Sequence, residues 1–135
     1  MGARGLGFAS ALCLALVCSM VRPAASLEGA GVLLQGLDKV TARVTTIETQ
    51  LGQTVHFGSL EITARRCFKR PPEESPESAA FLEIREIRQG EDSRPLFSGW
   101  MFASSPALSA LEHPVYDVWV KDCLNVKSTD DNEPR

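Results

Sequence analysis

The sequence holds few of the residues from which metal and catalytic sites are usually built. It contains two histidines, His56 and His113, and no HxH, HxxxH or CxxC motif. Zinc and copper sites need three or four such ligands at suitable spacing. A glycine-rich loop of the kind that cradles phosphate groups is also lacking. The sequence therefore predicts no metal site and no bound cofactor.

The first 26 residues have the pattern of a secretory signal peptide. Arg4 precedes an uncharged stretch from Leu6 to Met20, which is shorter than the roughly 20 apolar residues of a membrane-spanning helix but suits a signal-peptide core. Ala24-Ala25-Ser26 then supplies the small residues that a signal peptidase recognises. We expect cleavage after Ser26 and export of a mature protein with no membrane span.

Two cysteines in this stretch raise the alternative of a lipid-anchored protein. Cys13 and Cys18 follow the bulky residues Leu12 and Val17, whereas a lipoprotein cleavage site has a small residue there. The two thiols are therefore interpreted as apolar residues of a peptide that is removed.

The mature chain is mildly acidic and long enough for one domain. Removing the first 26 of 135 residues also removes Arg4 and Arg22, which changes the formal charge from -3 to -5. About 109 residues can build one modest core. The negative charge argues against a general affinity for nucleic acid or anionic membranes.

The two cysteines that remain, Cys67 and Cys123, are predicted to pair. An even number of cysteines in an exported chain is typical of a structural disulfide, and the absence of CxxC disfavours a redox-active pair. A bridge over nearly 60 residues would stabilise the fold by about 4 kcal/mol.

Hydrophobic residues recur mainly with a period of two, which is typical of half-buried strands. We expect a flexible leader at 27–36, a β domain at 37–125 and a disordered tail at 126–135. The expected fold is mainly β, a small antiparallel sandwich or barrel of about six strands with one short helix. The strands are expected at 39–49, 54–57, 60–68, 79–87, 96–102 and 115–123, and the short helix in 104–112.

Four local features refine this expectation. The first strand should turn Val40, Ala42 and Val44 to one half-buried face. The third should contain a bulge near Arg65 and Arg66, or else run past the sheet edge. Gly99 predicts a bulge or a close approach of another backbone. The last strand carries apolar residues on both faces, which is typical of an interior strand.

A serine hydrolase is the one catalytic alternative that the residues offer. The segment 98–109 contains four serines, and His113 and Asp117 follow, so the parts of a catalytic triad are present. The nearest serine motif, "FSGWM", lacks the GxSxG frame of a nucleophile elbow. We interpret His113 as capping a helix end or packing at the surface, and His56 as a strand surface residue.

Two groups of residues are candidates for an interaction surface. The basic cluster "RRCFKR" could attract an anionic partner, or it could be neutralised by the acidic residues of the next loop, Glu73, Glu74 and Glu77. Its members are Arg65, Arg66, Lys69 and Arg70. The large aromatics of the C-terminal half could line a binding surface, but core packing is the favoured interpretation. They are Trp100, Phe102, Tyr116 and Trp119.

Four stretches, taken in their order along the chain, resemble the domain of unknown function 2155 family, short exported proteins of Gram-negative bacteria. They are "LDKVTARVTTIE", "VHFGSLEITARRCFKRPPEESPE", "AAFLEIREI" and "LFSGWMFASSPALSALEHPVYDVWV" before a cysteine, between about Leu37 and Cys123. The resemblance implies a periplasmic protein and no reaction. We therefore expect a non-catalytic binding or structural domain at the cell envelope, with an unknown envelope protein or polymer as partner. The alternative is an envelope serine hydrolase that uses a serine in 98–109 with His113 and Asp117.

Overall fold

The computed structural model describes residues 26–127, together with residues 2 and 5. The predicted signal peptide at 1–26 lies almost wholly outside these residues, as does most of the predicted tail. The first two tail residues are described and make contacts. Val126 packs against the core, and the backbone nitrogen of Lys127 donates to the carbonyl of Glu28. The domain therefore extends to residue 127.

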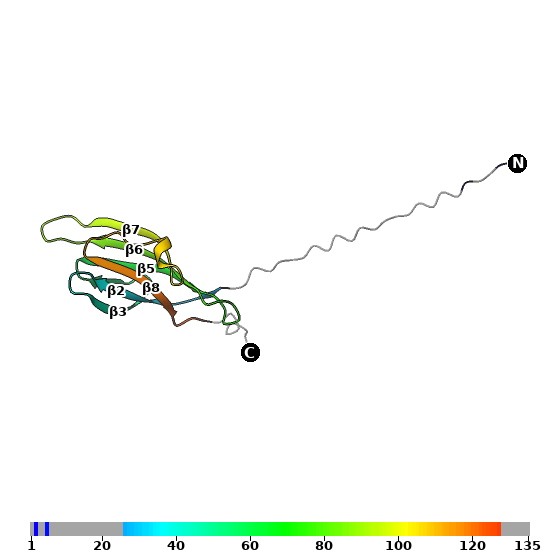
Figure 1. Ribbon diagram of the computed structural model, residues 1–135, viewed down its shortest axis with the longest axis horizontal. Helices are drawn as coiled ribbons and strands as arrows, with labels where there is room; N and C mark the ends of the chain where they lie inside the picture. Colours follow the sequence, from blue (N-terminus) through cyan, green and yellow to red (C-terminus); the bar gives the residue numbers. More distant parts are fainter. Residues whose placement is uncertain (1, 3–4, 6–25, 128–135) are drawn as a thin grey trace.

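The described chain forms two antiparallel sheets that pack face to face (Figure 1). The larger sheet has the order β1-β5-β6-β7, with β4 also paired to β5, and the smaller has the order β3-β2-β8. The mainly β prediction is confirmed, and the two sheets form a sandwich, with no closed barrel within residues 26–127. The strands are β1 (Leu27–Glu28), β2 (Gly31–Asp38), β3 (Arg43–Gln50), β4 (Thr54–Phe57), β5 (Leu60–Lys69), β6 (Ser78–Glu86), β7 (Arg94–Phe102) and β8 (Tyr116–Leu124).

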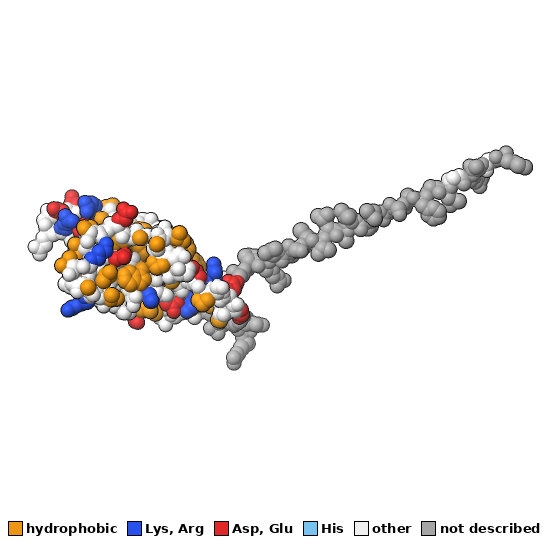
Figure 2. Space-filling view, viewed as in Figure 1, with side chains coloured by type: hydrophobic (Ala, Val, Ile, Leu, Met, Phe, Trp, Pro, Cys, Tyr) orange, Lys and Arg blue, Asp and Glu red, His pale blue; other side chains and the backbone are white. Residues whose placement is uncertain are grey.

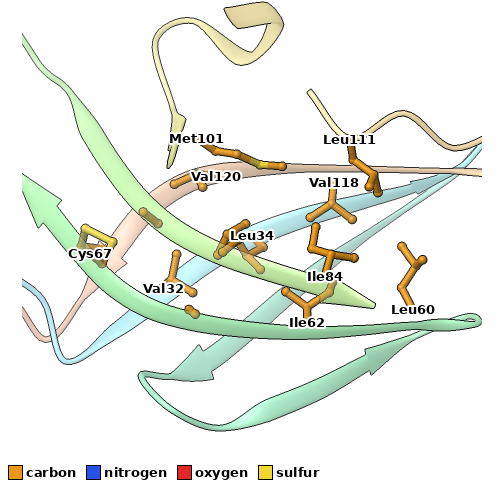
Figure 3. Packing of buried hydrophobic residues seen from close by; sticks show 14 residues of the cluster. Val32, Leu34, Leu60, Ile62, Cys67, Ile84, Met101, Leu111, Val118 and Val120 are labelled. Carbon is orange, nitrogen blue, oxygen red and sulfur yellow. A yellow bond between two sulfur atoms is a disulfide. The ribbon is translucent and has the colours of Figure 1, made fainter. Parts of the chain in front are cut away.

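The core is aliphatic and lies between the two sheets. Alternate residues of β2 and β8 point inward from the smaller sheet and meet alternate residues of β5 and β6 (Figure 3). Burial of these side chains provides the main stabilisation of the fold. The side chains that are almost fully buried are Val32, Leu34, Leu60, Ile62, Leu82, Ile84, Val118 and Val120.

The predicted disulfide is present and joins the two sheets. Cys67 on β5 and Cys123 on β8 are bonded, with 5.7 Å between their Cα atoms. Both residues belong to the core cluster. The bond therefore fixes one end of the sandwich.

The prediction of a flexible leader at 27–36 is wrong. Residues 31–36 belong to β2, which is the central strand of the smaller sheet. The "GVLLQG" run alternates as a half-buried strand does, because Val32 and Leu34 face the core. The glycines make this alternation hard to recognise in the sequence. At position 36, a glycine is required by packing. A Cβ atom at Gly36 would lie 2.7 Å from the Phe57 ring.

The prediction of a strand from residue 39 is wrong in its first four residues. Residues 39–42 form the turn between β2 and β3, because the Asp38 carboxylate accepts hydrogen bonds from the backbone nitrogens of Val40 and Thr41 at 2.9 and 3.2 Å. This side chain closes the turn locally. Val40 and Val44 are 78% and 53% exposed, so the expected half-buried face does not form.

The second to fifth predicted strands are confirmed as β4 to β7. The bulge expected near Arg65 and Arg66 lies between Ala64 and Arg66. The bulge expected at Gly99 lies instead beside Leu96, where the β6–β7 register shifts. A Cβ atom at Gly99 would meet only the Phe97 ring, at 3.5 Å, so this glycine admits no neighbouring backbone.

The C-terminal part of the fold agrees with the prediction except for the position of the last strand in its sheet. The expected helical segment is a single 3-10 turn, η1 (Pro106–Leu108), preceded by Ser105. The last strand is β8, but it lies at the edge of its sheet and not in the interior. Val118 faces the core while Trp119 is half-buried on the outer face. Apolar residues on both faces thus do not distinguish an edge strand from a central one.

Candidate functional site

His113 is buried in the segment that leads into β8, and both of its ring nitrogens form hydrogen bonds. Its Nδ1 accepts hydrogen bonds from the backbone nitrogens of Val115 and Tyr116 at 3.0 and 3.1 Å. Because Nδ1 is an acceptor, the ring proton is on Nε2. Nε2 donates this proton to the Glu86 carboxylate at 3.0 Å. The imidazole thus connects the segment that enters β8 to the end of β6 through hydrogen bonds.

Glu86 is the centre of this polar cluster. Its carboxylate is only 4% exposed and pairs with Arg88 at 3.2 Å and Arg94 at 3.0 Å. The Ser59 hydroxyl donates to it at 3.4 Å. The hydrogen bond from His113, together with the two guanidinium groups, lowers the pKa of Glu86 from 4.5 to about 2 despite the burial.

The predicted serine hydrolase set does not come together. None of the hydrogen bonds that the His113 ring makes within the described residues involves a serine of 98–109 or Asp117. Asp117 instead accepts a hydrogen bond from the backbone nitrogen of Val118 at 2.9 Å. Ser104 donates to Glu77. A general base needs a proton to abstract within reach, but the His113 Nε2 faces the Glu86 carboxylate and Nδ1 accepts from two backbone nitrogens. The prediction that His113 packs at the surface is also wrong, since the residue is buried.

The low pKa of Glu86 predicts a specific loss of stability in acid. A carboxyl group whose pKa is lower in the folded than in the unfolded state stabilises the fold fully above the unfolded value. This contribution is lost as the pH falls from about 4.5 toward about 2. We expect the urea midpoint of the native protein to exceed that of Glu86→Gln by a constant margin above pH 5. The margin should shrink between pH 4.5 and pH 2. Urea titrations of both proteins at several pH values measure it, and a margin independent of pH would contradict the assignment.

Three members of the basic cluster form ion pairs with acidic residues on three different strands. Arg65 pairs with Glu83 of β6, Arg66 with Glu28 of β1, and Lys69 with Asp122 of β8. The three nitrogen–oxygen distances are 3.0, 3.0 and 2.9 Å. The expected neutralisation by Glu73, Glu74 and Glu77 therefore applies at most to Arg70. Burial raises the pKa of Glu77, but hydrogen bonds from Ser104 and Ser78 and the charge of Arg70 lower it overall. The cluster is not a free anion-binding patch.

The large aromatics lie outside the fully buried core, although Tyr116 packs against it as predicted. Within residues 26–127 no aromatic side chain is among the buried hydrophobic residues, and Trp100 is 37% exposed. Its indole stacks on Phe68 at 5.9 Å between ring centroids and meets the edge of Phe81 at 5.6 Å. The rings of β5, β6 and β7 reach one another because the residue between Phe68 and Phe102 across the sheet is the small Ala79.

The aromatics and the basic cluster meet in one surface. The Arg66 guanidinium lies 4.9 Å from the centroid of the Phe68 ring, at a distance where a cation is attracted to an aromatic face. We call the outer face formed by Arg66, Phe68, Phe81 and Trp100 the aromatic–arginine surface. The charges on the molecule are otherwise mixed: on the face shown in Figure 2, basic and acidic side chains alternate around hydrophobic ones without a large area of one sign.

A hollow of about 290 Å³ lies at the disulfide end of the sandwich. It is lined by the ends of β5 and β8, the start of β6 with the loop before it, and the residues that follow β7. Burial raises the pKa of Asp122, but hydrogen bonds from Lys69, the Cys123 backbone and Ser78 lower it overall. Lys69, Ser78 and Asp122 thus bond to one another within the hollow. Within the described residues no three potential ligands are placed to hold a metal.

Glu86 is the residue that sequence reasoning missed. It follows Leu82 and Ile84 at the same spacing of two, so an alternating strand turns it toward the core. A charged residue at a core-facing position requires a buried partner. This signal was present in the sequence, although nothing in it identified His113 as that partner.

Comparisons with known proteins identify relatives without an assigned activity. A family described as "Uncharacterized protein conserved in bacteria (DUF2155)" matches residues 32–123. An uncharacterized protein of Rickettsia prowazekii is 36% identical over 88 residues, which are 65% of this chain and 57% of that protein. The chain thus spans a little over half the length of this relative. No solved structure matches. Among the described residues, no helix is long and apolar enough to cross a membrane.

Proposed function

The chain belongs to the DUF2155 family of uncharacterized bacterial proteins, and we propose that it is an exported domain of the cell envelope that works by binding. Its partner is an envelope protein or polymer, and it carries no catalytic site. The disulfide between Cys67 and Cys123 supports the export, because such bonds persist in oxidising compartments. The hydrogen bond between His113 and Glu86 supports a structural role for this histidine.

The aromatic–arginine surface is the observation that carries the binding proposal. Tryptophan and arginine are enriched in the residues that dominate binding energy at interfaces. Here a partly exposed Trp100 stacks on Phe68, which lies under the Arg66 guanidinium. The contacts hold these side chains in place before a partner arrives, which reduces the entropy lost on binding.

We expect Trp100→Ala and Arg66→Ala to abolish most of the partner capture. A photoreactive crosslinker at Ser98, which neighbours Trp100 on the same face of β7, would trap the partner in intact cells before pull-down. Loss of a hot-spot side chain costs about 2 kcal/mol or more, so the yield at limiting partner concentration should fall at least about tenfold.

Leu108→Ala is the matched control for this experiment. Leu108 is an apolar residue that is 77% exposed, lies on η1 and is not one of the four residues of the surface tested. Its capture should equal that of the native protein. Equal capture by all three variants would contradict binding through this surface. Hydrolysis of ester, peptide or glycan substrates by the purified protein, lost in His113→Ala, would contradict the non-catalytic proposal itself.

A further inference from the structure

β3 is an edge strand that lacks most of the features that usually protect such edges. Within residues 26–127 it pairs with β2 alone, in continuous register over eight residues. It lies at the lower margin of the domain in Figure 1. Its sequence "RVTTIETQ" contains no proline and no lysine, and only Ile47 and Thr49 are not exposed. Unpaired backbone groups along such a strand form a template for another extended chain.

The other edges of the two sheets are protected. β7 contains Pro95 and the bulge at Leu96, and η1 packs beside it. β8 contains a bulge at the exposed Lys121. β4 and β1 have only four and two residues. Bulges, prolines, lysines and short strands are the usual means of blocking edge-to-edge pairing. β3 differs from all of these edges.

We propose that β3 is a strand-addition site for an extended segment of another protein, which pairs antiparallel with it and continues the smaller sheet. Alternating amides and carbonyls are matched along their whole length only by another extended backbone, so the occupant is a polypeptide and not a small ligand. Val44, Thr45 and Thr46 make up half of the six exposed residues of β3. These residues favour β-branched neighbours across the strands.

The charges of β3 favour a different protein over a second copy. Arg43 shares the face of Ile47 and Thr49, and Glu48 lies on the opposite face. When two copies extend one sheet about a two-fold axis, residues opposite each other share a face. Arg43 of one copy therefore never opposes Glu48 of the other. A foreign antiparallel segment matches both charges if it has a basic residue and, five positions later, an acidic one.

The direction of the β3 amides allows a selective test. The Lys39 amide donates to the Val115 carbonyl, beside β8. Because successive residues of a strand direct their backbone N–H and C=O groups to opposite sides, those of Asp38 point to β3, where Asp38 pairs with Arg43. Odd-numbered residues of β3 then bond to β2. The amides of Val44, Thr46 and Glu48 point to the free edge. Thr46→Pro removes one outward amide and leaves the bonds to β2 intact, and Thr46→Ala is the control that keeps the amide.

The probe is a synthetic eight-residue peptide of threonine and valine with lysine third and glutamate eighth, which places these charges opposite Glu48 and Arg43. Added to the purified disulfide-bonded protein, it should slow hydrogen exchange of the Val44 and Glu48 amides, measured by NMR. We expect Thr46→Pro to bind about tenfold more weakly, which corresponds to about 1.4 kcal/mol, and Thr46→Ala to bind as the native protein does. Circular dichroism melts verify that both variants fold. A peptide with the two charges exchanged should protect less.

Three results would overturn the proposal. The peptide could leave the Val44 and Glu48 amides unprotected, or it could bind Thr46→Pro as tightly as Thr46→Ala. The protein alone could sediment as a dimer that Thr46→Pro dissociates, in which case the occupant is a second copy. The proposal rests on the proposed binding function but uses another surface. Trp100→Ala should therefore leave peptide protection unchanged, and a failed peptide test would leave the crosslinking result at the aromatic–arginine surface intact.

Discussion

Replacing both Cys67 and Cys123 with alanine should lower the free energy of unfolding by about 4 kcal/mol. The bond closes a loop with a sequence separation of 56 residues, and the chain-entropy model gives this value for such a loop. It also joins the two sheets through β5 and β8, so its loss frees one end of the sandwich. For a domain of about 100 residues we expect a decrease in Tm of about 15 °C or more. Urea titration and calorimetry measure both quantities.

Reduction of the native protein is the control for this double substitution. Dithiothreitol should shift the urea midpoint by a similar amount, while the alanine double variant should not respond to it. A native protein whose midpoint is the same with and without reductant would contradict a stabilising role for the bond.

Leu34→Ala should cost about 3 kcal/mol, because it leaves a cavity in the core. Leu34 has no exposed surface and lies on β2, the central strand of the smaller sheet. Val44→Ala on the neighbouring strand is the matched control, since Val44 is 53% exposed. It should change the free energy of unfolding by no more than about 0.5 kcal/mol. Urea denaturation followed by tryptophan fluorescence measures both.

A small effect of Leu34→Ala would have a clear meaning. It would show that the segment before residue 37 does not contribute to the core, as the glycines of "GVLLQG" alone would lead one to expect. Equal losses in Leu34→Ala and Val44→Ala would likewise contradict the packing described for the two strands.

Local sequence patterns predicted the parts of the fold that depend on local physics. Alternation identified β4 to β8, and the bulge predicted near Arg65 and Arg66 lies between Ala64 and Arg66. The tight turn between β4 and β5 contains Gly58, which has a φ of 56°, a conformation that other residues rarely adopt. The failures were also local. Asp38 closes a turn inside a run of alternating residues, and Gly31 and Gly36 lie in a strand whose neighbours fill the space they leave.

The side chains of the aromatic–arginine surface and of the His113–Glu86 pair come together through contacts between residues far apart in the chain. Local sequence patterns do not reveal such contacts. Arg66 reaches Glu28 and the Phe68 ring, and Trp100 stacks across β6 on a residue 32 positions earlier in the chain. The basic cluster and the aromatics were separate features in the sequence, and only the sheet order makes them one surface. His113 and Glu86 are likewise 27 residues apart. Their pairing directs the His113 Nε2 to a carboxylate and not to a serine of the alternative hydrolase set.

The proposed export and the bond that joins the two sheets are tested most directly by mass spectrometry of the native protein. The mature chain should begin at Leu27, and digestion without reductant should yield one peptide pair joined through Cys67 and Cys123. A native protein that retains residues 1–26, or whose two cysteines react with iodoacetamide before reduction, would contradict the export or the bond, respectively.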